Sequence, residues 1–116
     1  MKNRVNTKAF SFAIIMISFL SIATLIVAVS VLLSKIDGQV PLHWSPKFGI
    51  DKWGSKKDML TSAVIIPSVL GLLFNCGAII AHRLKQYGVS VLCSSLTLAI
   101  VVAFASASIT LLVSVL

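Results

Sequence analysis

Three uncharged apolar runs constrain this chain more than any other feature. They cover residues 9–33, 59–81 and 89–116 and are 25, 23 and 28 residues long. About 20 helical residues cross the roughly 30 Å hydrocarbon layer of a bilayer, and inside that layer only a helix or a closed barrel pairs every backbone group. Each run therefore predicts one transmembrane helix, and the predicted fold class is an all-α integral membrane protein with three transmembrane helices.

The composition agrees with this prediction. Hydrophobic residues make up 58% of the chain and charged residues 11%, whereas a soluble domain has about 25% charged residues. What remains between the runs is a loop over residues 34–58 and a short connector over residues 82–87. We therefore expect residues 1–116 to form a single membrane domain in contact with the lipid bilayer.

The first apolar run has two interpretations. Basic residues precede it, as they precede the core of a secretory signal, and Ala28, Val29 and Ser30 resemble a weak cleavage site. The run is, however, about twice as long as a usual signal core. We expect an uncleaved membrane anchor.

Basic residues bear on orientation, because they concentrate on the cytoplasmic side of spans. The amino-terminal tail and the connector are short, basic and free of acids, whereas the loop offsets its five lysines with three aspartates. We expect a cytoplasmic amino terminus and connector, with the loop and the carboxyl terminus outside. The net charge of +7 comes from residues that flank spans, where they meet anionic headgroups, so no nucleic acid partner is expected.

The spans contain no Asp, Glu, Lys, Arg or His. Pumps and ion-coupled transporters usually need such groups inside the membrane, so transport by this chain alone is not expected. In the loop, His43 and Asp51 fall short of the three or four ligands of a zinc site, and no nucleophile lies beside an orienting group. We predict no catalysis, no metal and no cofactor. Cys76 and Cys93 are expected to be small buried apolar side chains.

Two spans carry patterns for helix packing. Ser95, Ala99, Ala103 and Ala107 recur every four residues, a spacing that lets helix backbones approach closely. This stripe predicts packing either within the chain's own bundle or against another chain. In the second span Pro67 predicts a kink. Gly71 and Asn75 complete the predicted interface, with Asn75 hydrogen-bonded between helices.

The loop is predicted to be ordered. Ser55 and Asp58 fit a capping box, which predicts that the second helix begins at Lys56. Upstream, Pro41, Pro46, Gly49 and Gly54 predict successive turns. Three aromatic residues lie among them, and such residues settle at membrane surfaces. A compact extracytoplasmic loop between helices 1 and 2 is therefore expected.

The loop motif PxHW, followed by GxDxxGSK, and the apolar helix after it resemble a known family. This is the membrane domain of unknown function at the amino terminus of SdpI-type bacterial toxin-immunity proteins, and the resemblance covers roughly residues 9–87. It implies a multi-pass protein of the bacterial cytoplasmic membrane that protects its host from a membrane-active peptide. The candidate binding residues are Pro41, His43, Trp44, Gly49, Asp51, Trp53, Gly54, Ser55 and Lys56.

Two functional hypotheses follow. In the first, an immunity-like or sensing protein recognises a secreted peptide or lipid through the loop. In the second, the chain is an accessory subunit that docks through the small-residue stripe onto a larger membrane complex or a further copy of itself. The short chain and the absence of chemistry in the spans suit the second hypothesis as well.

Overall fold

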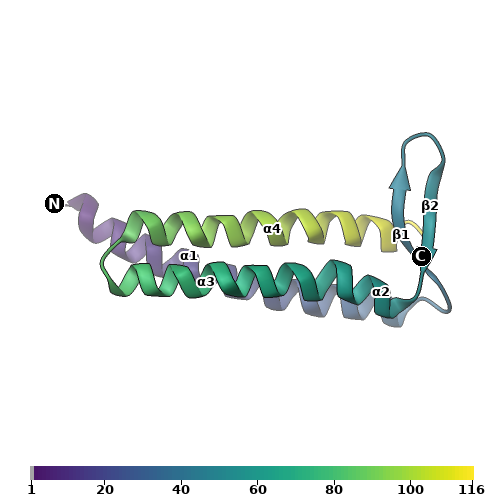
Figure 1. The fold of residues 1–116 in the computed structure, drawn as a ribbon, viewed down its shortest axis with the longest axis horizontal. Helices are drawn as coiled ribbons and strands as arrows, with labels where there is room; N and C mark the ends of the chain where they lie inside the picture. Colours follow the sequence, from purple (N-terminus) through teal and green to yellow (C-terminus); the bar gives the residue numbers. More distant parts are fainter. Residues whose placement is uncertain (1) are drawn as a thin grey trace.

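The computed structural model describes the backbone of residues 2–116 and the side chains of residues 6–116. It is an elongated three-helix bundle that carries a β-hairpin at one end (Figure 1). The elements are α1 (Lys2–Ser34), β1 (Val40–Ser45), β2 (Gly49–Gly54), α2 (Lys56–Leu60), the π-helical segment η1 (Thr61–Ile65), α3 (Ile66–Arg83) and α4 (Tyr87–Val113). The helical stretches Asn6–Ser34, Lys56–Arg83 and Tyr87–Val113 are long and apolar enough to cross a membrane, which confirms the three-span prediction.

The second span is interrupted ahead of its proline. Pro67 lies in the first turn of α3 and η1 directly precedes it. Proline lacks an N–H, and its ring collides with the carbonyl four residues earlier in a regular α-helix. The wider π turn is one way in which a helix accommodates this conflict. The sequence predicts a kink at Pro67; the irregularity that the structure shows there is a π-helical segment on its amino-terminal side.

The capping box is present as predicted. Asp58 N donates to Ser55 Oγ at 3.1 Å, and Ser55 N donates to an Asp58 carboxylate oxygen at 3.3 Å. α2 begins at Lys56. Each of these bonds satisfies a backbone donor that no helical carbonyl can reach.

The ordered loop is a β-hairpin and not a series of turns. β1 and β2 pair antiparallel, with Val40 opposite Gly54 and Trp44 opposite Ile50, and β1 is irregular around His43. Gly49, the first residue of β2, has a φ of 71°. This left-handed backbone conformation favours glycine. Pro41 is tolerated because both strands of an isolated hairpin are edge strands.

A line of polar contacts joins the three spans. Ser18 Oγ donates to Asn75 Oδ1 at 2.9 Å, and Thr97 Oγ1 donates to the Gly71 carbonyl at 3.1 Å. Nearer the connector, Ser11 is hydrogen-bonded to His82 at 2.8 Å. Asn75 is fully buried, so the interhelical role predicted for it is confirmed.

The small-residue stripe faces outward. Ala99, Ala103 and Ala107 are exposed and Ser95 is partly exposed, while the inward face of α4 is formed by Ser90, Ser94, Thr97, Val101, Ser108 and Leu112. The first of the two alternatives for the stripe, packing within the chain's own bundle, is therefore wrong. The physical reason is that α4 turns its hydroxyl-bearing face toward α1 and α3, where Thr97 finds a bonding partner.

The two cysteines do not behave alike. Cys93 is partly buried, but Cys76 is exposed on the outside of the bundle. The expectation of a buried Cys76 is therefore wrong. Its neighbour Asn75 takes the inward position, which turns Cys76 toward the surrounding lipid.

Candidate binding groove

A hollow on the surface of the molecule lies where the hairpin meets α4. It has a volume of about 650 Å³ and is lined by three residues of β1, four of α4 and Ser114 directly after α4: Leu42, His43, Trp44, Ser106, Ala107, Thr110, Leu111 and Ser114. A smaller cavity of about 200 Å³ adjoins it, between α4 and the first turns of the second span. The two cavities share Leu42, Ala107 and Leu111. We call the two together the hairpin groove.

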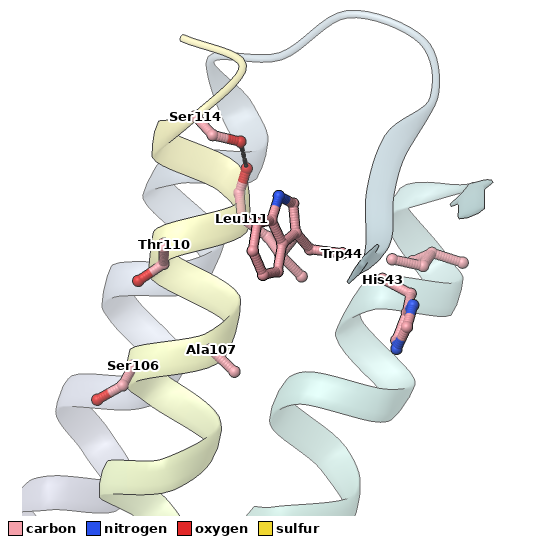
Figure 2. Close-up of a pocket in the computed structure, with 8 residues that line it drawn as sticks. His43, Trp44, Ser106, Ala107, Thr110, Leu111 and Ser114 are labelled. Atoms are coloured by element: carbon pink, nitrogen blue, oxygen red, sulfur yellow. Dashed lines mark hydrogen bonds between the residues drawn. The ribbon is translucent and has the colours of Figure 1, made fainter. Parts of the chain in front are cut away.

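Trp44 and Ala107 give the groove its shape. In Figure 2 the indole of Trp44 reaches from β1 to the last turns of α4, beside Leu111. Ala107 lies one turn further into the bundle, and its methyl group leaves open space where a larger side chain would fill it. The indole remains 54% exposed, so it covers the groove only in part.

The lining is mostly hydrocarbon with a few polar groups. Leu42, Trp44 and Leu111 supply apolar surface, and the hydroxyls of Ser106 and Thr110 point away from the hairpin along α4 (Figure 2). Pockets of this kind bind apolar ligands and use a small number of polar groups to fix orientation. The groove therefore suits an amphipathic ligand better than a small charged one.

His43 and Asp51 join the two strands of the hairpin. His43 Nδ1 lies 2.7 Å from Asp51 Oδ1, with 65% of the histidine side chain and 35% of the aspartate side chain exposed. Because His43 also lines the groove, this contact holds one wall of the groove to β2. Within the described part of the chain no three His, Cys, Asp or Glu side chains gather as a metal site would require.

Gly54 supports the groove from behind. A Cβ placed on Gly54 would overlap Leu42 Cδ1 and would lie 3.1 Å from an Asp58 carboxylate oxygen. Glycine at this position therefore lets Leu42 enter the groove while the capping box forms beside it. Its place in the loop motif follows from this close approach and not from a left-handed backbone.

The structure separates the predicted binding residues into two groups. His43 and Trp44 line the groove, whereas the others shape or flank the hairpin: Pro41 is buried at its base, Gly49 closes its turn, Asp51 holds His43, Trp53 is exposed, and Gly54, Ser55 and Lys56 form the junction with α2. Ala107, predicted as part of a helix interface, is a groove residue. The contribution of Leu42, Thr110 and Leu111 was missed, since sequence spacing does not show which face of α4 meets the loop.

Gly71 and Asn75 lie elsewhere, in the middle of the bundle. A Cβ on Gly71 would lie 3.1 Å from both Ile22 Cδ1 and Thr97 Cγ2. Gly71 is thus the point where side chains of α1 and α4 approach the backbone of α3 most closely among the glycines of the spans. These two predicted interface residues act within the chain and not at the groove.

Comparisons of this chain with protein-family models, with curated proteins and with solved structures found no match.

Proposed function

We propose that this protein is a non-catalytic, immunity-like protein of the bacterial cytoplasmic membrane, which binds a membrane-active peptide in the hairpin groove. The observation that carries the proposal is the groove itself, which combines a wall from the hairpin with a wall from the exposed face of a span. The resemblance of the loop motif to SdpI-type immunity proteins supports the same role. In this proposal the hairpin and the carboxyl terminus face the outside.

The position of the groove fits such a ligand. A membrane-active peptide is amphipathic and gathers at the boundary between headgroups and acyl chains. The hairpin groove lies at the end of α4, at that same boundary for a helix that spans the bilayer. An apolar side chain of the peptide would pack against Leu111 and Trp44. The polar face of the peptide would contact His43 and the rest of the hairpin.

In this proposal the groove binds the peptide and breaks no bond in it. The hydroxyl groups of the groove belong to Ser106, Thr110 and Ser114. Its one imidazole belongs to His43, whose Nδ1 lies 2.7 Å from Asp51 Oδ1. Activation of a serine needs a general base within hydrogen-bond reach of its hydroxyl, and within the described part of the chain His43 is hydrogen-bonded to Asp51 and not to a hydroxyl of the groove. Protection would therefore come from capturing the peptide before it disrupts the membrane.

The first test uses the strand-to-strand contact. Asp51→Ala removes the partner of His43, and an exposed pair of this kind contributes about 0.5–1 kcal/mol, which corresponds to about a two- to fivefold change in affinity. Cells that express the variant should die at a correspondingly lower peptide dose in a survival assay with a panel of purified membrane-active bacterial peptides. Asp37→Ala removes an exposed aspartate outside the hairpin and should change nothing. Equal survival curves for both variants, at equal membrane abundance, would contradict a role for the pair.

A second candidate function rests on a different observation. Ala99 and Ala103 are exposed on the outer face of α4, where a helix of another chain would approach closely. This placement favours an accessory subunit of a larger membrane complex or a homo-oligomer. It uses the exposed stripe of α4 that runs from Ala107 toward the connector.

The subunit hypothesis makes its own prediction. Ala103→Leu adds bulk to the stripe and should release the chain from a partner, because it holds the helix backbones apart. The measurement is co-purification from native membranes in a mild detergent, followed by mass spectrometry. Val102→Leu, a similar change at the neighbouring exposed position, is the control. A partner retained by both variants would count against docking through the stripe.

A further inference from the structure

The hairpin exposes three aromatic side chains. Trp44, Phe48 and Trp53 are 54%, 73% and 47% exposed, and the two tryptophans are the only ones in the chain. Residues of this kind have large apolar bodies, and tryptophan adds an N–H that seeks a polar partner. Such exposure on a short hairpin indicates a surface that another phase or molecule covers.

The position of the hairpin in the fold indicates which surroundings its aromatic side chains contact. It projects sideways from the bundle end and extends past α4 (Figure 1). At this end the spans are bounded by Ser34, Lys56 and Val113, and the ends of α1, α2 and α4 lie close to one another there (Figure 1). A structure that extends sideways at this level lies over the surrounding lipid and not over the ends of the helices. In Figure 2 the Trp44 ring lies beside Leu111, which places it within the last turns of a span.

Charge adds a preference among lipids. Lys47 and Lys52 are exposed on the hairpin, while its one aspartate, Asp51, is paired with His43. The Lys47 ammonium lies 5.4 Å from the centre of the Phe48 ring, so a cation and an apolar ring are presented together at the tip. At the hairpin base, Lys56, Lys57 and Asp58 leave the local charge positive. Basic residues beside a membrane are attracted to anionic headgroups.

We propose that the hairpin binds the surface of the lipid leaflet at its own end of the bundle. Trp44 and Trp53 lie at the boundary between headgroups and acyl chains, and Lys47 and Lys52 contact anionic phosphates. The partner is thus an anionic bilayer surface. This surface shares Trp44 with the hairpin groove, but the proposal does not depend on the capture of a peptide there.

The two tryptophans are built-in reporters for a test. The full chain is reconstituted in phosphatidylcholine vesicles with and without phosphatidylglycerol, and tryptophan emission is measured with brominated acyl chains and with aqueous iodide as quenchers. Trp44→Phe and Trp53→Phe isolate the signal of each indole. We expect brominated lipid to quench both, with blue-shifted emission and weak quenching by iodide. Emission typical of water, with strong iodide quenching and none by brominated lipid, would overturn the proposal.

The lysines are tested in the same vesicles. Phosphatidylglycerol should increase quenching by brominated lipid in the unmodified chain, and the double variant Lys47→Gln, Lys52→Gln should lose this increase and fall to the level seen in phosphatidylcholine. The matched control, Lys8→Gln with Lys85→Gln, removes two exposed lysines at the opposite end of the bundle and should retain it. An increase that survives in the hairpin variant would overturn the assignment to anionic lipid.

Discussion

Gly71→Leu is expected to lower the free energy of unfolding of the bundle by about 3 kcal/mol or more, the upper range for overpacking a filled interior. The backbone of α3 at Gly71 is approached from two sides, because a Cβ there would lie 3.1 Å from side-chain carbons of Ile22 and of Thr97. A leucine needs space that both neighbours already occupy. It would also push α4 away and stretch the 3.1 Å hydrogen bond from Thr97 to the Gly71 carbonyl.

The measurement is thermal or denaturant unfolding of the purified chain in a fixed detergent, followed by circular dichroism. Gly88→Leu is the matched control, since a Cβ at Gly88 meets nothing within 4 Å and the residue lies in the first turn of α4. Gly71→Ala should give an intermediate loss, because the side-chain ends that face it can shift by a few tenths of an ångström. Equal stability of the Gly71→Leu and Gly88→Leu chains would show that the helices do not meet at Gly71 as described.

The spans and the start of the second helix could be predicted because both depend on local sequence. Run length alone identifies a helix that crosses the bilayer, and the Ser55–Asp58 capping box involves residues three apart. The hairpin could not be predicted in the same way. Its prolines and glycines are turn signals in isolation, and the pairing of Trp44 with Ile50 depends on the register of two strands across their connection.

The orientation of α4 was also beyond local sequence. α4 is apolar on all sides apart from its small hydroxyl residues, so no amphipathic pattern shows which face is buried. The decisive contacts are with other helices: Thr97 with the Gly71 carbonyl and Ser90 with Ser11. These bonds turn Ala107 outward, and the lateral extension of the hairpin then places Trp44 above it. The groove is therefore a product of tertiary packing, which explains why the sequence indicated its hairpin wall and missed its helical wall.

Ala107→Phe is expected to abolish peptide protection, with a loss of at least about tenfold in tolerated dose, equivalent to about 1.4 kcal/mol of binding free energy. Ala107 borders both cavities of the hairpin groove, so a phenyl ring there occupies the volume that the peptide side chain would enter. The assay is the survival experiment with purified membrane-active peptides. Membrane abundance and circular dichroism should match those of the unmodified chain, because the added ring fills open space and displaces no packed side chain.

Ala99→Phe is the matched control for Ala107→Phe. Ala99 lies two turns away on the same exposed stripe of α4 but does not line the groove. If the groove captures the peptide, Ala99→Phe leaves protection intact while Ala107→Phe removes it. If the stripe instead docks α4 on another chain, both rings obstruct the same approach and both variants lose function together. The pair of substitutions therefore separates the two proposed functions, because the two sites share one helix face and differ only in depth along it.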